Sequence, residues 1–295
     1  MDRHEREALR SQAMLDFDLP AVPPRLTELA APQPDAEALE VSAPAGRFLV
    51  LVGATGSLTL AFEATLFDLL AECRYPAPRP RRAKSGALIA RLQGKAAASC
   101  YARPPGEAIS PEQASPPQLL EVGRLLARLH QLGEAHPASV ADPLGGASLT
   151  GALPDGPVRD VLLPFLQAGV AALPLGAAHG RLGPGQMLFV GERASGVLPG
   201  GRACAMPLVL DLAEAALAWM AGLVEPLPAL RAVVSGYQAL RRLTPEEREA
   251  LFDALRFAAA REGALLLLAG RREEALKPLA VVESLGAAEV RAAAG

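Results

Sequence analysis

Short apolar runs dominate the first hundred residues, and their spacing predicts a small unit rich in β-strands. The runs at 39–41 and 48–52 flank a short turn and predict a β-hairpin. From 58 to 73, apolar residues recur at intervals of three and four, which is the helical period. Two further strands are predicted at 86–91 and 95–101.

The pattern changes after the breaker Ala102-Arg-Pro-Pro-Gly106, beyond which helical periodicity predominates. Thr244-Pro-Glu-Glu247 has the order of a helix start, with Thr as N-cap, Pro in the first turn and Glu three residues on. The predicted helices cover 117–132, 157–173, 209–223, 226–242 and 245–269.

The sequence therefore predicts three parts. Residues 1–36 combine one charged helix at 1–19 with a segment, 20–36, whose five prolines predict irregular chain. Residues 37–104 form the strand-rich unit with one helix, and residues 105–295 form a larger helical unit. This order is typical of the α+β class.

Composition and charge narrow the class of protein. The chain is 51% hydrophobic and 21% charged, with a net charge of −3, so it has no global positive field for nucleic acid or anionic lipid. Its most apolar stretch, 48–62, falls short of the ~20 residues that cross a bilayer. Three widely spaced cysteines and a charged start predict a cytoplasmic protein with no membrane or nucleic-acid partner.

Most motifs that carry chemistry are missing from the sequence. It has no Cys-x-x-Cys, His-Glu-x-x-His, Gly-x-Ser-x-Gly or Walker A loop, and we expect no metal site. Gly53-Ala-Thr-Gly56 after an apolar run permits a dinucleotide-binding turn, but no βαβ alternation follows it. That alternative stays open here as the weaker one.

One segment is informative. His179-Gly-Arg-Leu-Gly-Pro-Gly-Gln186 leads through Ser195-Gly-Val-Leu-Pro199 to Asp211-Leu-Ala. It resembles the catalytic segment of the aminoglycoside phosphotransferase and homoserine kinase type II family, which reads His-Gly-Asp-Leu-His-Pro-Gly-Asn, then Ser-Gly-Val-Ile-Asp. Glu121–His130 and Ser235–Arg248 are similar to family helices, so the likeness covers roughly 45–270. The resemblance implies a bilobal protein-kinase-like fold, with a small antiparallel-sheet lobe and a larger helical lobe carrying a catalytic-type loop at 179–203.

The residues that carry the family's chemistry are replaced. By the resemblance, Arg181 stands at the catalytic Asp, Gln186 at a metal-binding Asn and Pro199 at a second metal-binding Asp. A guanidinium stays protonated and cannot act as a base, and Pro199 offers no side-chain oxygen. His179 and Asp211 match the family as scaffold residues, and we expect Arg181 to fill the vacated metal position against Asp211 or Glu214.

The sequence also lacks residues that would bind the phosphates of a nucleotide. The strand 48–52 has no basic residue, and the expected phosphate-covering stretch at 31–41 has no glycine. Asp35 and Glu37 there would repel phosphates. If a nucleotide binds, the resemblance places it at the hinge near Tyr101 and Arg103.

Three hypotheses follow. The leading one is a pseudokinase, with no cofactor, that works by binding a protein partner or a second copy of itself. The second is an active ATP- and Mg²⁺-dependent phosphotransferase on a small hydroxyl- or amine-bearing metabolite, using carboxylates such as Asp155, Asp160 or Glu214. The third is a small-anion sensor that binds through Arg181.

Overall fold

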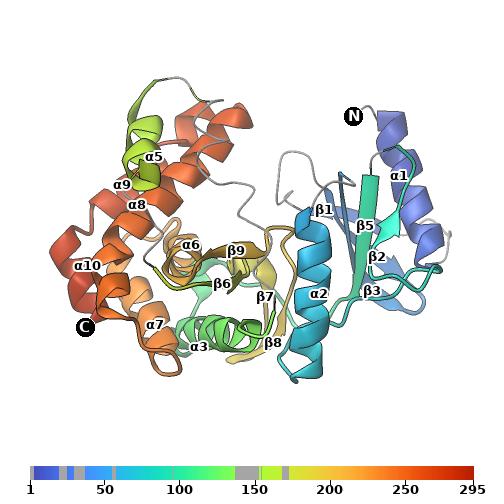
Figure 1. The fold of residues 1–295 in the computed structure, drawn as a ribbon, viewed down its shortest axis with the longest axis horizontal. Coiled ribbons are helices and arrows are strands. Elements are labelled where there is room, and N and C mark those ends of the chain that lie inside the picture. The colour runs from blue at the N-terminus through green and yellow to red at the C-terminus, as the bar shows by residue number, and fades with distance from the viewer. Residues whose placement is uncertain are drawn as a thin grey trace.

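The computed structural model describes residues 3–19, 25–29, 37–54, 58–94, 96–136, 153, 155–167 and 173–295. Two lobes lie side by side, a small one around a five-stranded sheet and a larger helical one (Figure 1). We call the part up to residue 102 the small lobe and the part from 105 onward the large lobe. This bilobal α+β arrangement is the one expected from the sequence.

The small lobe is built on an antiparallel sheet of strand order β1-β2-β3-β5-β4. The strands are β1 (Arg25–Leu29), β2 (Glu37–Ala43), β3 (Gly46–Ala54), β4 (Ala90–Arg91) and β5 (Ala96–Ala102). The predicted hairpin is confirmed, because β2 pairs with β3 through Val41 and Phe48. β3 also pairs antiparallel with β5, which rules out the parallel sheet that a dinucleotide-binding turn requires. Residues 55–57 of that turn lie outside the described residues.

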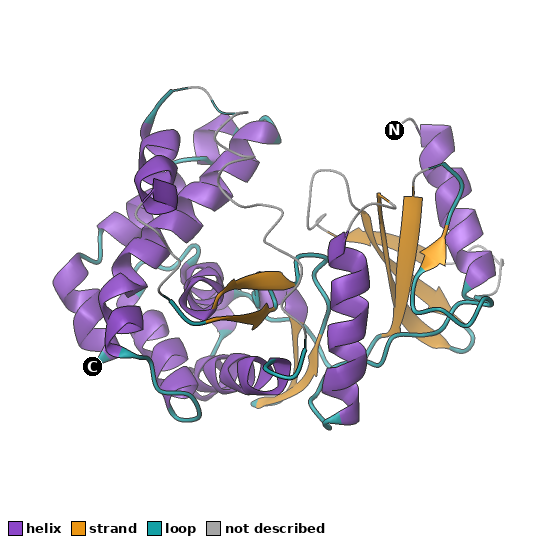
Figure 2. Ribbon diagram, viewed as in Figure 1, coloured by secondary structure: helices purple, strands orange, loops and turns teal. Residues whose placement is uncertain are grey.

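Helices cover both faces of this sheet, α1 (Arg3–Asp16) on one and α2 (Leu58–Glu72) on the other (Figures 1 and 2). Successive side chains of a strand point to opposite faces. Val50 and Val52 accordingly join the apolar cluster of α1, whereas Leu49 and Leu51 join that of α2 and the large lobe. This double burial explains why 48–52 is apolar without alternation.

Two predictions for the small lobe were wrong. Residues 25–29 form a strand inside the segment expected to be irregular, because its five prolines flank Arg25–Leu29 without interrupting it. The remainder of that segment, 20–24 and 30–36, lies outside the described residues, as does Asp35. Of the predicted strand 86–91, only Ala90 and Arg91 pair, since Gly86 takes a left-handed turn at φ +83°.

Helices make up most of the large lobe (Figure 2). They are α3 (Pro116–Gly133), α5 (Pro157–Gln167), α6 (Leu208–Met220), α7 (Leu227–Gln238), α8 (Pro245–Leu268), α9 (Lys277–Glu283) and α10 (Ala287–Ala294). Thr244 caps α8 as predicted, accepting the Glu247 N–H while the Glu247 carboxylate accepts the Thr244 N–H. The part of the predicted helix 157–173 beyond Gln167 lies outside the described residues up to 172.

α3 and α7 cross at a contact between two glycines. A Cβ on Gly123 would lie 2.0 Å from the Val233 carbonyl oxygen, and one on Gly236 would lie 2.0 Å from the Leu120 carbonyl oxygen. Neither position has room for a side chain, so both glycines are required by the close approach of the backbones.

Two short β-pairs complete the large lobe. β6 (Leu175–Ala178) pairs with β9 (Cys204–Pro207), and β7 (Met187–Val190) pairs with β8 (Arg193–Val197). Glu107, near the start of the large lobe, exchanges two backbone hydrogen bonds with Phe189 of β7. Within the described part of the chain, no helix has the length and apolar character needed to cross a membrane.

Candidate functional site: the catalytic-type loop

The catalytic-type loop, 179–203, runs from β6 to β9 and is anchored by Asp211 in the first turn of α6. The Asp211 carboxylate accepts the backbone N–H groups of His179 at 2.7 Å and Gly180 at 2.8 Å. Gly180 sits at φ +84°, and a Cβ there would lie 2.3 Å from the Arg202 carbonyl oxygen. A glycine and a buried carboxylate thus set the path of the loop at its start.

The same carboxylate is also hydrogen-bonded to His130 of α3, whose Nε2 lies 3.0 Å from Asp211 Oδ2. His130 Nδ1 is 2.7 Å from the Tyr237 hydroxyl of α7, which also accepts a hydrogen bond from Arg241. Burial by itself would raise the pKa of Asp211, but the hydrogen bonds from His130 and from the His179 backbone N–H lower it. Asp211 therefore stays ionised as a structural anion that joins three helices.

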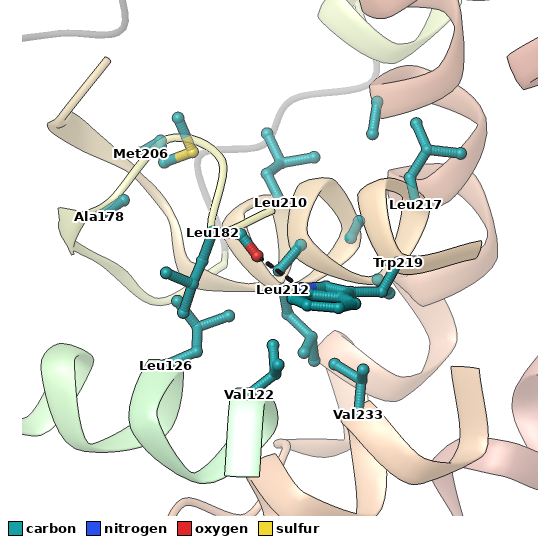
Figure 3. Close-up of a cluster of buried hydrophobic side chains, with 14 of the residues drawn as sticks. Val122, Leu126, Ala178, Leu182, Met206, Leu210, Leu212, Leu217, Trp219 and Val233 are labelled. Carbon is teal, nitrogen blue, oxygen red and sulfur yellow. Dashed lines mark hydrogen bonds between the residues drawn. The ribbon is translucent and has the colours of Figure 1, made fainter. Parts of the chain in front are cut away.

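His179 also serves the scaffold. Its ring is fully buried, and Nε2 lies 2.9 Å from the Leu198 carbonyl oxygen, which assigns the proton to Nε2 because a carbonyl can only accept. Burial lowers the pKa of His179, so the ring is neutral near pH 7. Three residues further on, Leu182 inserts into the large-lobe core, and its carbonyl accepts the Trp219 indole N–H at 3.0 Å (Figure 3).

Arg181 forms an ion pair with Glu262 of α8, and not with either of the two partners expected from the sequence. The expected partners are both occupied: Asp211 accepts the loop amides, and Glu214 is paired with Arg261 at 2.7 Å. The Arg181 guanidinium nevertheless acts on its surroundings. It lowers the pKa of the Glu262 carboxyl against the opposing effect of burial.

Arg202 joins Arg181, Glu262, Arg261 and Glu214 in one ionic cluster. Burial, together with the charge of Arg181, lowers the pKa of Arg202 to about 10, so it too stays protonated near pH 7. Three arginines against two glutamates leave a formal charge of +1.

Gln186 and Pro199 lie close together in the loop. The Gln186 carbonyl accepts the Leu198 N–H at 2.8 Å, next to Pro199. A Cβ on Gly200 would lie 3.5 Å from the His179 ring and 3.6 Å from Gln186 Cγ. The loop thus brings positions 179, 186 and 199–200 together, and the side chains at these positions themselves provide one amide and no carboxylate.

Glu63 is the site residue that sequence reasoning missed. It belongs to α2 of the small lobe and is 0% exposed. Its side chain contacts the part of the loop that follows Pro199. Its carboxylate accepts the N–H groups of Gly200 at 3.2 Å, Gly201 at 2.8 Å and Ala203 at 3.4 Å. Burial raises the pKa of Glu63 to about 7, against the effect of these amides, which lower it.

A signal for Glu63 was present in the sequence. It lies three residues before Leu66 and seven before Leu70, on the apolar face of the predicted helix. An acidic side chain on a buried face requires partners. Those partners are backbone groups from 137 residues away, which no local pattern reveals.

The hinge residues are engaged within the protein. Tyr101 is buried against Phe67, with ring centroids 5.8 Å apart. Arg103 pairs with Glu40 at 3.1 Å and donates to the Gly106 carbonyl at 3.1 Å. Away from the hinge, Glu37, expected from the sequence to repel phosphates, pairs with Arg10 of α1 at 3.0 Å.

The donor set at the loop does not fit a magnesium ion. Mg²⁺ on a nucleotide takes carboxylate or amide oxygens, whereas Arg181 and Pro199 supply none and Glu214 is neutralised by Arg261. The Asp155 side chain is 95% exposed and pairs with Arg159, and Asp160 is also exposed. Among the described residues, no three His, Cys, Asp or Glu side chains gather closely enough to hold a metal ion.

Comparison with known proteins places this geometry in context. Residues 35–251 match the model of the phosphotransferase enzyme family. A homoserine kinase of Rhodopseudomonas palustris is 32% identical over 213 residues, which are 65% of this chain and 63% of that protein. The chain therefore spans less than two thirds of the length of that relative.

Solved structures show the same fold. An amicoumacin kinase superposes with a TM-score of 0.76 over 99% of this chain and 94% of that chain, at 14% identity. The aminoglycoside phosphotransferase APH(4)-Ia gives a TM-score of 0.61 over 98% of this chain and 100% of that chain, at 13% identity. At these identities the likeness establishes the bilobal kinase-like fold and nothing finer.

Proposed function

The chain belongs to the phosphotransferase enzyme family, and we propose that it has given up phosphoryl transfer and works by binding a partner. The observation that carries the proposal is the ion pair of Arg181 with Glu262. It occupies the position where the family resemblance places the carboxylate that faces the acceptor hydroxyl. A paired guanidinium there can neither accept a proton nor ligate a cation.

The loss of metal ligands points the same way. Phosphoryl transfer depends almost entirely on positioning and on charge neutralisation by metal-bound phosphates. Pro199 contributes no oxygen, and the only side-chain oxygen that replaces the usual ligands is the Gln186 amide. The positive charge of the Arg181–Arg202–Arg261 group instead balances Glu214 and Glu262 within the protein.

Glu63 supports the proposal from the small lobe. In protein kinases, a lysine on the third strand pairs with a glutamate on the following helix to hold the nucleotide phosphates. Here β3 has no lysine, and apolar Leu49 and Leu51 face α2. The carboxylate of Glu63 binds the amides of 200–203 and closes the small lobe on the loop without a nucleotide.

The second candidate is an active kinase, and the likeness to homoserine kinases favours it. On that alternative the chain would phosphorylate a small hydroxyl-bearing amino acid with ATP. It would have to do so with Arg181 in place of a base. The third hypothesis, an anion sensor at Arg181, is opposed by the engagement of that guanidinium with Glu262.

The test combines turnover and nucleotide binding. The full chain is assayed for phosphate transfer from ATP to homoserine, with the homoserine kinase of Rhodopseudomonas palustris as the positive control. ATP binding is measured by calorimetry with and without Mg²⁺. We expect no turnover above the no-enzyme rate and no Mg²⁺-dependent binding. Turnover that is lost in Arg181→Ala but kept in the surface control Arg193→Ala would overturn the proposal.

The partner is a protein, either a second copy of the chain or another molecule. Light scattering over a range of concentrations distinguishes these, because a second copy raises the mass above the 30.7 kDa of the monomer. A mass that stays monomeric assigns the partner to a different protein.

A further inference from the structure

A groove on the large lobe, away from the catalytic-type loop, collects three arginines. It has a volume of about 570 Å³ and lies between α7, the start of α8 and the end of α10. These helices lie on the side of the large lobe that faces away from the small lobe (Figure 1). Its polar wall consists of Arg231, Ser235, Gln238, Arg242 and Arg248.

The local geometry explains why these side chains converge. Arg231, Ser235 and Gln238 are spaced by four and three residues along α7 and therefore share one face of that helix. Gln238 Nε2 donates to the Ala294 carbonyl at 3.1 Å, which fixes α10 as the opposite wall. Arg248 comes from the first turns of α8.

The groove is strongly basic. Arg231, Arg242 and Arg248 are all exposed, and within the described part of the chain none of them forms an ion pair or hydrogen bond through its side chain. None of the groove's lining side chains is acidic, and the carboxylate of Gly295, which also lines the groove, opposes three arginines with a single negative charge. Three like charges around one concave surface repel one another and create a positive potential in a chain whose net charge is −3.

The acidic residues at the start of α8 offset the positive charge of the groove only in part. Glu247 is buried and pairs with Arg241 at 3.0 Å. Glu249 lies 3.5 Å from Arg291. Hydrogen bonds from its own backbone and from Thr244 lower the pKa of the Glu246 carboxyl, and the charge of Arg248 lowers it further, so Glu246 offsets part of the Arg248 charge.

We infer that this groove binds a compact multivalent anion, of phosphate or polycarboxylate chemistry. Guanidinium groups are planar forks that pair with two oxygens of such an anion at once. A concave site of this size suits a small molecule rather than a polymer. The Ser235 hydroxyl and the Gln238 amide supply neutral hydrogen-bonding groups between the charged ones.

Calorimetry on the full chain tests the inference, with sodium pyrophosphate and sodium citrate as the two probes. Titrations are run at about 50 mM and about 150 mM salt, because screening separates a specific site from diffuse attraction. We expect saturable binding of one anion per chain for at least one probe. Pyrophosphate alone would identify phosphate chemistry, and citrate alone would identify carboxylate chemistry.

The variant for the groove is Arg231→Gln/Arg248→Gln, and the matched control is Arg193→Gln, an exposed arginine on β8. The double variant is expected to weaken binding by about tenfold or more, since two charge-assisted contacts are lost. The control should change the affinity by less than about twofold. Thermal unfolding checks that each variant folds, and Arg242→Gln replaces the double variant if it does not.

Two results would overturn the inference. One is the absence of saturable binding of either probe to the unaltered chain at both salt concentrations. The other is binding that the groove variants leave unchanged, which would place the anion elsewhere on the protein.

Discussion

The Glu63 carboxylate accepts the Gly201 N–H at 2.8 Å, which joins a helix of the small lobe to the loop that follows β8 in the large lobe. The carboxylate lies among the amides of Gly200 and Ala203 as well, with no exposed surface. The partners of Glu63 are backbone N–H donors and not a lysine. The contact between the two lobes is therefore made by the protein alone, without a bound nucleotide.

Glu63→Ala should lower the free energy of unfolding by about 3 kcal/mol or more at pH 7. Three buried N–H groups would lose their acceptor, at about 1–3 kcal/mol each, and a cavity would form. Urea unfolding measures the change. Glu72→Ala, near the exposed end of the same helix, is the control and should cost less than about 1 kcal/mol. Equal losses in the two variants would contradict this role for Glu63.

Stability should depend on pH through the same residue. The pKa of Glu63 is about 7 in the folded chain, against an ordinary value of 4.5, so the folded state holds its proton more tightly. Its contribution is therefore fully present below about pH 4.5 and is lost as the pH rises through 7. The stability of the wild type relative to Glu63→Gln should fall by about 3 kcal/mol between pH 5 and pH 8. A difference that stays constant across this range would show that Glu63 does not titrate there.

Asp211→Ala should be among the most damaging substitutions in the large lobe, at about 3–5 kcal/mol. It would remove the acceptor of the His179 and Gly180 amides and leave His130 without its partner. Asp211→Asn keeps one oxygen and should cost less. Thermal unfolding with a tryptophan fluorescence readout suits the test, because Trp219 lies in the same core. If the Asn variant were the less stable of the two, this account of Asp211 would be wrong.

Arg181 and Glu262 should show a coupling of about 1 kcal/mol in a double-mutant cycle. Their side chains are 31% and 20% exposed, so the pair lies between a surface ion pair and a buried one. Salt should reduce the coupling, whereas the Arg261–Glu214 coupling should resist it, because that pair is buried. A cycle over Arg181→Ala, Glu262→Ala and their combination, and a second cycle over Arg261→Ala and Glu214→Ala, each at low and high salt, give the two couplings. No coupling at low salt would remove the main support for a paired Arg181.

Gly123→Ala should destabilise the chain by more than about 3 kcal/mol, because the new methyl group would collide with the Val233 carbonyl. Gly185→Ala is the matched control, since a Cβ there meets nothing within 4 Å. Chemical unfolding compares the two. Tolerance of alanine at both positions would mean that the α3–α7 crossing can open.

Local pattern was sufficient for most elements. The apolar spacing of 58–73 and the Thr244–Glu247 start each identified a helix that the structure contains. These features depend on neighbours within a few residues, so the sequence carries them directly. Where pairing with another strand decided the outcome, as for Arg25–Leu29, which pairs with β2, local reasoning failed.

The sequence by itself determined the family, because an ordered motif from His179 to Asp211 needs no coordinates to be read. Only the tertiary structure decided which groups the side chains of this segment contact. Arg181 lies 81 residues from Glu262 in the chain, and Glu63 lies 138 from Gly201. The physical reason is that the partner of a buried charge is chosen by packing, which brings together groups that no spacing along the chain relates.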